Sequence, residues 1–358
     1  MSDMLITMCV IAYNEEQNIN GILECIKNQD YDHNNMEVVL VDGASTDNTR
    51  ALMCEFALDN KDEFRRVVVL DNPKKTLPSG WNVALREYKG DAIIKVDAHA
   101  VIPEDFVSKN VRVLETGEYI CGGQRPNIID KPTPFKETLL LAESSMFGSS
   151  IASYRNNPGK TYVKSLFHAA YRREVFEKVG FFNEELVRTE DNEIHYRMRK
   201  AGYKLCFDPD IISYQYTRSS LRAMLKQKYA NGYWIGKTSK VCPKCLSIYH
   251  FVPFAFVSAI IASGSVIGAT GLTECIKKRH NHTLGKGILT LRKVTVVLTT
   301  VMWVLYALMA SGMAAVSAFK AEDKRNITNA CLPVLFLLLH LSYGIGTIAG
   351  LMDKSKRG

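Results

Sequence analysis

The sequence lacks the two glycine-rich signatures that most often cradle phosphate groups. No G-x-G-x-x-G follows the first apolar run, and G-x-x-x-x-G-K-[ST] occurs nowhere in the 358 residues. The first absence argues against a dinucleotide-dependent oxidoreductase, and the second against a P-loop hydrolase. A diphosphate bound near carboxylates without such a cradle needs a divalent metal ion to bridge the like charges.

A disulfide framework and a signal peptide are also missing. The nine cysteines are scattered and odd in number, as expected of reduced thiols. The apolar run Leu5 to Ala12 has no basic flank before it and no small-residue cleavage site after it. We therefore expect the front of the chain to stay on the cytoplasmic side.

The front two thirds of the chain have no net charge. Residues before Tyr249 hold 33 basic and 33 acidic side chains, whereas the tail from Tyr249 to Gly358 holds 12 basic and 4 acidic ones. The whole formal charge of +8 therefore belongs to the tail. This distribution argues against nucleic acid as a partner and favours an anionic membrane surface.

The tail contains three apolar runs without any Asp, Glu, Lys or Arg, namely Tyr249 to Thr273, Val294 to Phe319 and Ala330 to Met352. Each has 23 residues or more, and a bilayer span needs about 20. Three spans would leave six Lys/Arg on the side of the front domain and nine on the other side, contrary to the positive-inside tendency. A first run that re-enters, folding back at 263–265, would give twelve against three. Both topologies stay open.

A basic amphipathic segment, Leu221 to Trp234, precedes the tail. It is typical of a helix at the level of lipid headgroups, or of a helix packed on the front domain, and the sequence does not choose between them. We divide the chain into a catalytic domain at 1–225, a juxtamembrane segment at 226–248 and a membrane region at 249–358.

The front domain alternates short β-branched apolar runs with longer amphipathic stretches. This rhythm is typical of βαβ units, a sheet with parallel strands and helices on both faces. The series runs through Leu5 to Ala12, Glu16 to Lys27, Glu37 to Val41, Asp47 to Ala57, Arg66 to Leu70, Leu77 to Tyr88 and Ala92 to Val96.

Polar residues follow four of the predicted strands, where ligands collect in open α/β sheets. Any one such group of polar residues at a strand end is more often part of a turn or a helix cap. Acidic groups at several successive endings would repel one another unless a cation or a donor-rich ligand binds there. The endings begin at Tyr13, Asp42, Asp71 and Asp97.

The pair Asp97 and His99 has the spacing of two ligands to one metal ion, because residues two apart at a strand end can turn to the same side. A carboxylate with an imidazole is an acceptable set for Mn²⁺ and is less typical of Mg²⁺.

Taken in order, the motifs resemble those of family 2 inverting glycosyltransferases, which have a GT-A fold: a mixed, Rossmann-like sheet flanked by helices. The D-A-H-A form, with C-G-G-Q-R-P at 121–126, is most similar to the succinoglycan-type exopolysaccharide glucosyltransferases. The resemblance rests on C-V-I-A-Y-N-E-E at 9–16, V-L-V-D-G-A-S-T-D-N-T at 39–49, K-V-D-A-H-A at 95–100 and T-E-D-N-E at 189–193.

The resemblance implies a role for each of these positions. Asp42 would bind the nucleobase, most often uracil, with Tyr13 and Glu15 completing the nucleoside pocket. Asp97 and His99 stand at the family's D-x-D position, which contacts the ribose and the metal ion, Mn²⁺ or Mg²⁺, at the diphosphate.

The Glu190-Asp191 pair matches the family's catalytic base, with Asp191 at the position of the base itself. Such a carboxylate removes the proton of the acceptor hydroxyl as the oxygen attacks the anomeric carbon. Both residues also suit the acidic first turn of a helix that Gly202 ends.

We therefore expect a multi-pass enzyme of the cell membrane that transfers a sugar from a UDP-sugar to a lipid-linked saccharide in cell-surface glycan synthesis, within a possible polysaccharide assembly complex. One alternative is a polyprenyl-phosphate glycosyltransferase, whose acceptor phosphate needs no general base. Another is a non-catalytic nucleotide-sugar-binding scaffold of an export complex.

Overall fold

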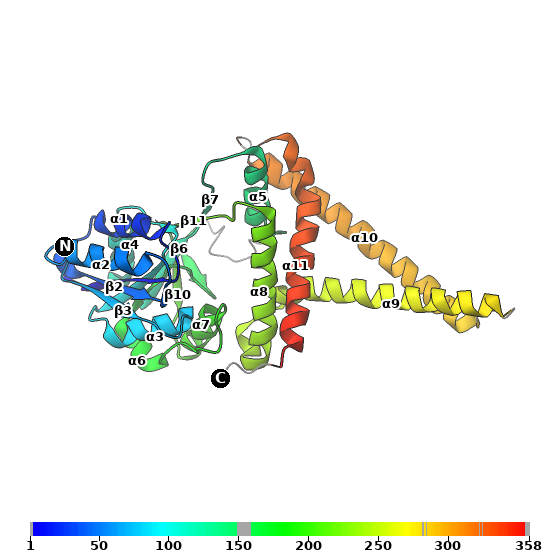
Figure 1. Cartoon of the computed structure of the whole chain (residues 1–358), viewed down its shortest axis with the longest axis horizontal. Helices are drawn as coiled ribbons and strands as arrows, with labels where there is room; N and C mark the ends of the chain where they lie inside the picture. The colour runs from blue at the N-terminus through cyan, green and yellow to red at the C-terminus, as the bar shows by residue number, and fades with distance from the viewer. Residues whose placement is uncertain are drawn as a thin grey trace.

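The computed structural model describes residues 3–148, 159–280, 283, 285–321, 323 and 325–354. Figure 1 shows an α/β domain that carries the N-terminus and, beside it, a group of long helices. Two of these helices form a hairpin that points away from the α/β domain. The chain thus has two structurally different parts, and the predicted α/β fold is confirmed.

The α/β domain is built on an eight-stranded sheet of order β3-β2-β1-β4-β9-β6-β10-β8. Its first four strands are parallel, whereas β9 runs antiparallel to both of its neighbours. The strands are β1 (Ile6–Ala12), β2 (Met36–Asp42), β3 (Arg66–Asp71), β4 (Ala92–Asp97), β6 (Ile120–Gln124), β8 (Thr161–Val163), β9 (Ala170–Arg172) and β10 (Leu205–Ile212). A small second sheet has the order β5-β11-β7, with β5 (Ala100–Val101), β7 (Asn127–Ile128) and β11 (Tyr214–Tyr216).

Helices cover both faces of the large sheet because its strands are apolar on both sides. In β1, Met8 and Val10 belong to one buried cluster and Cys9 to the other. The first cluster lies under α1 (Ile19–Lys27) and α4 (Phe106–Glu115), and the second under α3 (Leu77–Glu87), α6 (Arg173–Val179) and α7 (Glu190–Lys200). The element α2 (Thr49–Asp59) packs beside α1 and β3, and the short turn η1 (His33–Asn35) precedes β2.

The helical part combines elements from distant parts of the sequence. It contains α5 (Pro134–Ser144), α8 (Leu221–Val241), α9 (Val252–Arg279), α10 (Lys286–Lys320) and α11 (Leu332–Met352), with the short turns η3 (Pro243–Cys245), η4 (Ile248–Phe251) and η6 (Ile327–Cys331). Because α5 comes from within 1–225 and α8 begins at Leu221, the helical part includes residues that precede the predicted boundary at 225.

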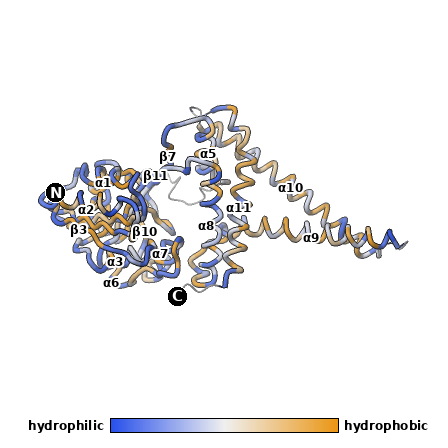
Figure 2. Tube along the Cα trace, viewed as in Figure 1, coloured by the Kyte–Doolittle hydropathy of each residue, from blue (hydrophilic) through white to orange (hydrophobic). Residues whose placement is uncertain are grey.

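In the described part of the chain, three helices are long and apolar enough to cross a membrane, and they contain the three predicted apolar runs. Figure 2 shows these helices as the most continuously hydrophobic stretches, with a hydrophilic tip where α9 meets α10. Helix α9 is continuous through Ser263–Ser265. The re-entrant alternative, which needs the chain to fold back there, is therefore wrong.

Candidate active site

The loops after β1 and β2 lie side by side at the carboxyl edge of the sheet. The backbone N–H of Asn14 donates to Ser45 Oγ at 3.0 Å, and Thr46 N–H donates to Asn14 Oδ1 at 2.8 Å. Tyr13 is 46% exposed on this edge, whereas Asp42 is buried and accepts a hydrogen bond from Ser45 N–H at 3.1 Å. The ring of Tyr13 is therefore partly exposed at this edge, next to loops that hydrogen bonds hold in place.

Beside these loops lies a cavity of about 310 Å³. Five of the seven predicted site residues line it, and Tyr13 and Asp42 do not. The five are Glu15, Asp97, His99, Glu190 and Asp191. The structure thus brings together residues that lie up to 176 positions apart in the sequence.

Asp97 ends β4 between a lysine and a histidine. Lys95, two residues earlier on the same face of the strand, forms a buried ion pair with its carboxylate. Burial alone would raise the pKa of Asp97, but the positive charge of Lys95 holds this pKa well below its usual value. Asp97 is therefore an ionised carboxylate whose negative charge is balanced by the ammonium group of Lys95.

His168 supports Asp97 as a neutral imidazole. Burial lowers its pKa to about 4, and its Nε2 accepts the backbone N–H of Asp97 at 3.3 Å. The proton therefore resides on Nδ1, which lies 2.9 Å from Ser213 Oγ. His168 also has a left-handed backbone, with φ of 48°. A side chain without an assigned role in the sequence thus fixes the end of β4.

Glu190 and Asp191 occupy the first turn of α7, where the helix dipole favours negative charge. Asp191 Oδ1 accepts the N–H of Asn192 at 2.7 Å. Among the described residues, no group hydrogen-bonds the buried Oε2 of Glu190. Burial and the charge of Asp191 raise the pKa of Glu190 to about 8, and burial raises that of Asp191. The pair thus retains one proton more readily than two exposed carboxylates would.

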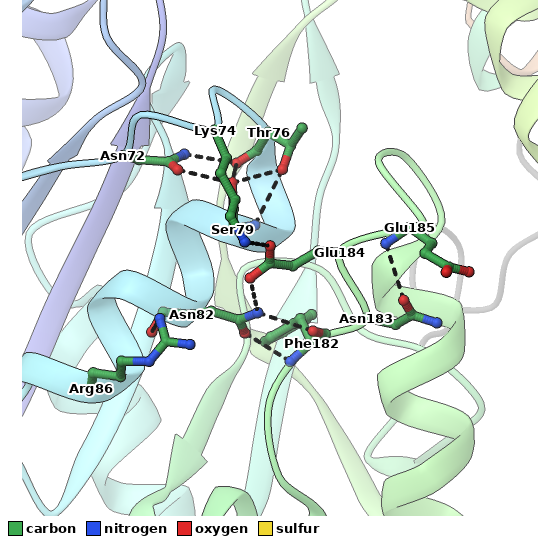
Figure 3. Close-up of polar contacts among 10 residues, drawn as sticks. All are labelled: Asn72, Lys74, Thr76, Ser79, Asn82, Arg86, Phe182, Asn183, Glu184 and Glu185. Carbon is green, nitrogen blue, oxygen red and sulfur yellow. Dashed lines mark hydrogen bonds and ion pairs between the residues drawn. The ribbon is translucent and has the colours of Figure 1, made fainter. Parts of the chain in front are cut away.

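The loop before α7 is held on its far side by α3 (Figure 3). Asn82 donates to Phe182 O at 3.0 Å and accepts from Phe182 N–H at 2.8 Å. Its amide also donates to Glu184 Oε1 at 2.9 Å, while Lys74 binds Glu184 Oε2 at 2.7 Å. These contacts fix the backbone that leads into Glu190.

The same loop is held on its other side by α8. Arg188 donates to Asn231 Oδ1 at 2.8 Å, and the hydroxyls of Thr189 and Thr238 form a buried hydrogen bond. Asn231 also lines the cavity, together with Gln227, Arg188 and Arg218. A helix from the apolar half of the molecule therefore forms one side of the cavity. Helix α8 thus contacts the front domain on one side and packs along α11 on another, an arrangement compatible with both alternatives for 221–234.

Aromatic rings close the interior of the cavity. Trp81 stacks on Phe182 with ring centroids 4.8 Å apart and meets Tyr171 edge-on at 6.2 Å. Phe167 lies under the guanidinium of Arg125, 3.7 Å from the ring centroid. Apolar ring faces beside carboxylates suit a sugar, which has both apolar C–H faces and hydroxyl groups.

The residues fit a divalent metal ion only if a ligand supplies further oxygens. Among the described residues, no group of three or more His, Cys, Asp or Glu side chains could hold a metal. Glu15 Oε1 lies 3.3 Å from Nδ1 of His99, an arrangement that orients metal-binding histidines through the other ring nitrogen. Asp97 and His99 can thus provide two ligands, and a diphosphate would provide the others.

Comparison with known proteins agrees with this geometry. Residues 7–180 match the family described as glycosyl transferase family 2, and this stretch includes β1, β2, β4 and the acidic residues at their ends. The chain carries a family 2 glycosyltransferase domain. The predicted enzyme class is confirmed, and this finding favours an enzyme over a non-catalytic scaffold.

Two relatives extend the similarity beyond that stretch. The chain is 28% identical to the succinoglycan biosynthesis protein ExoA of Rhizobium meliloti, covering 64% of this chain and 68% of the relative. It is 26% identical to the dolichyl N-acetyl-α-D-glucosaminyl phosphate 3-β-D-2,3-diacetamido-2,3-dideoxy-β-D-glucuronosyltransferase of Methanococcus voltae, covering 72% and 80%. The glycosyltransferase is thus related to enzymes of glycan synthesis.

One solved structure resembles nearly the whole chain. It is the mannosyltransferase PcManGT from Pyrobaculum calidifontis in complex with GDP-Man and Mn²⁺, with a TM-score of 0.54 at 18% identity. The likeness covers 98% of this chain and 88% of that chain, so it includes the helical part. It confirms the GT-A fold.

Sequence reasoning missed several residues that shape the site. Lys95, His168 and Asn82 are buried polar side chains. His168 and Asn82 contact elements far away in the sequence, whereas Lys95 pairs with Asp97 in the same strand. A lysine inside an otherwise apolar strand was the one available signal, since lysine is almost never buried without a partner. Asn82 and His168 gave no local signal.

Proposed function

We propose that the glycosyltransferase transfers a sugar from a UDP-sugar to a lipid-linked saccharide, with inversion of the anomeric centre. The observation that carries this proposal is that one cavity has two unlike sides. One side holds the buried carboxylates of the GT-A domain, and the other is α8, which packs along the apolar helix α11. A soluble donor and a membrane-bound acceptor can therefore meet there.

The donor nucleotide is assigned to the sheet edge. Tyr13 offers a half-exposed ring to the base, and Asp42 and Glu15 complete the nucleoside pocket that the family resemblance implies. The loop bonds between Asn14, Ser45 and Thr46 keep this edge in shape without a ligand. The diphosphate would then reach Asp97 and His99.

Asp97 and His99 would hold a divalent ion, Mn²⁺ or Mg²⁺. When bound, the ion neutralises the charge that develops on the departing diphosphate. Lys95 keeps Asp97 ionised and fixes its position, and Glu15 orients the ring of His99. The presence of Mn²⁺ with GDP-Man in the structural relative supports this assignment.

Asp191 is the proposed general base, and Glu190 its protonated neighbour. Burial raises the pKa of both carboxyls, but at Asp191 the backbone N–H of Asn192 and the charges of Lys95 and Arg125 oppose the rise, so we assign the ionised form to Asp191 and the protonated form to Glu190. The carboxylate of Asp191 accepts the acceptor's hydroxyl proton as the oxygen attacks the anomeric carbon from the face opposite the nucleotide. Glu190 stays neutral and keeps a second negative charge away from the reaction.

The acceptor is assigned to the side of α8. Gln227 and Asn231 offer amides that can bind sugar hydroxyls, and Arg188 and Arg218 offer positive charge at the opening. The Methanococcus voltae relative is named for a dolichyl-phosphate-linked sugar, which supports an acceptor of this kind. We place the catalytic domain at the cytoplasmic face, in a pathway of exopolysaccharide or other cell-surface glycans.

The two arginines also support a second candidate, a polyprenyl-phosphate glycosyltransferase. There the attacking atom is a phosphate oxygen that carries no proton at neutral pH, so no general base is required. Asp191 distinguishes the two candidates, because only a hydroxyl acceptor depends on it.

The test is an assay of nucleotide release with membranes containing the enzyme, a panel of UDP- and GDP-sugars, Mn²⁺ or Mg²⁺, and lipid extract as the acceptor source. We expect Asp191→Asn to lower kcat by about 10²–10⁴-fold with unchanged nucleotide binding, and Asp59→Asn, an exposed site on α2, to have no effect. Full turnover by Asp191→Asn would overturn the hydroxyl acceptor and favour the lipid phosphate.

A further inference from the structure

Helix α11 packs against α8 over its whole length, and the two helices run in the same direction. A Cβ atom on Gly232 would lie 1.9 Å from Tyr343 O, and one on Gly350 would lie 2.0 Å from Tyr233 O. Ser342 donates to Leu225 O at 2.8 Å. The glycines therefore allow backbone contact, and α11 cannot change its tilt without α8.

Helix α8 is not a helix of the bilayer interior. It carries five basic residues, at 222, 226, 228, 237 and 240. Its central residues Gln227 and Asn231 line the catalytic cavity, and Thr238 is bonded to Thr189 of the loop before α7. The centre of a spanning helix lies about 15 Å from water on either side. The centre of α11 lies instead at the level of an aqueous active site.

Both ends of α11 are bonded to helices that directly follow strands of the small sheet: α5 follows β7, and α8 follows β11. At its start, in η6, Thr328 Oγ1 donates to Pro134 O of α5 at 3.0 Å. At its end, Asp353 pairs with Lys237 of α8 at 3.3 Å, and Lys240 Nζ donates to Asp353 O at 2.9 Å. A spanning helix would place these two ends on opposite faces of the membrane.

The outer side of α11 carries a continuous apolar stripe. Val334, Ile345 and Met352 are 59%, 49% and 73% exposed, and their spacing places them on one helix face. Figure 1 shows α8 and α11 running together between the catalytic domain and the α9–α10 hairpin, which extends away on the far side. The hairpin begins beside the middle of α11, where a Cβ atom on Gly344 would lie 2.4 Å from Pro253 O.

We propose that α11 lies flat in the membrane surface on the side of the catalytic domain, and that only the α9–α10 hairpin crosses the bilayer. The stripe of α11 would enter the boundary between headgroups and acyl chains, as apolar faces of in-plane helices do. The catalytic cavity would then open at headgroup level, beside α8.

The charge distribution supports this arrangement. With α11 in the plane, nine Lys/Arg flank the apolar helices on the catalytic side and six lie at the hairpin tip, between α9 and α10. Three spans would give the reverse, six against nine. The proposed topology thus follows the positive-inside tendency, which a three-span topology violates.

The first experiment measures on which side α11 ends. Single cysteines are labelled with a membrane-impermeant maleimide in sealed vesicles from cells that make the full-length protein. Cys275, exposed near the hairpin tip, reports the far side, and Leu58→Cys, 72% exposed on α2, reports the catalytic side. We expect Lys354→Cys to be labelled like Leu58→Cys. Labelling like Cys275 would overturn the proposal.

The second experiment measures depth, with bimane-labelled cysteines and vesicles of phosphatidylcholine brominated at known acyl positions, in a background with Cys275→Ser and Cys331→Ser. We expect equal, shallow quenching at positions 334, 345 and 352 of α11. Positions 294, 304 and 319 of α10, which are also exposed, serve as the spanning control and should be deepest at 304. A maximum at 345, or no quenching along α11, would overturn the proposal.

Discussion

The two sides of the catalytic cavity depend on different forces. The sheet side presents buried charges that stabilise one another, with Lys95 balancing Asp97, and Glu190 and Asp191 sharing a proton. The α8 side presents neutral amides, and its position depends on backbone contact between glycine-bearing helices. Electrostatics thus determines the chemistry on one side, whereas packing determines access on the other. Substitutions can separate the two effects.

The largest effect is expected where the charges meet. Lys95→Met leaves the carboxylate of Asp97 buried without its cation, and breaking a buried pair from one side costs about 3–5 kcal/mol. We expect a lower thermal unfolding temperature and a loss of nucleotide-sugar binding. The double variant Lys95→Met/Asp97→Asn should recover most of the stability but not the activity. Equal unfolding temperatures of the single and the double variant would mean that the Lys95–Asp97 ion pair does not stabilise the sheet side of the cavity.

A packing substitution tests the other side. In Gly232→Ala the new methyl group meets the backbone of Tyr343, and such overpacking costs about 1–3 kcal/mol. We expect a reduced kcat with acceptor and unchanged UDP binding, because α8 shifts while the sheet edge does not. Gly264→Ala, on α9 with no atom within 4 Å, is the matched control and should behave as the native enzyme. Identical kinetics of the two variants would contradict the comparison.

A pH series tests the shared proton. The raised pKa of Glu190 means that the folded protein retains a proton which the unfolded chain loses, so stability falls as pH rises from the ordinary carboxyl range toward about 8. Glu190→Gln cannot ionise. We expect its unfolding temperature to fall by several degrees less than that of the native protein over this window. Parallel curves would show that Glu190 titrates normally.

The smallest effect is expected at the opening of the cavity. Asn231→Ala removes the acceptor of the hydrogen bond from the exposed Arg188, a contact worth about 1 kcal/mol. We expect the KM for the acceptor to rise about fivefold, with an unchanged kcat and an unchanged KM for the donor. Asn34→Ala, an exposed site away from the cavity, is the control. A higher donor KM would place the nucleotide on the α8 side instead.

The strand ends of the fold were predictable from the sequence, because apolar β-branched runs and the polar residues after them are local signals. The starts of β1, β2, β3 and β4 lie within about one residue of the predicted runs. The motif at 189–193 likewise predicted the first turn of α7. A local sequence pattern was enough to predict the strand or helix and its functional residues where both belong to one short segment.

What the sequence could not predict are contacts between distant segments. Asn82 and Phe182 are 100 residues apart, and the bond between Thr328 and Pro134 spans 194 residues. Hydropathy has a similar limit, since α10 and α11 are both apolar enough to cross a membrane. The two helices differ in their packing, because α8 lies along α11.

The pairing of α8 with α11 also sets an order of events during synthesis. Leu225 and Ser342, which are bonded across the pair, are 117 residues apart, and the whole α9–α10 hairpin is made between them. Contacts of such large sequence separation form late. The α8 side of the cavity therefore reaches its final position only after the hairpin has left the ribosome, so the active site is completed after α9 and α10 have been made.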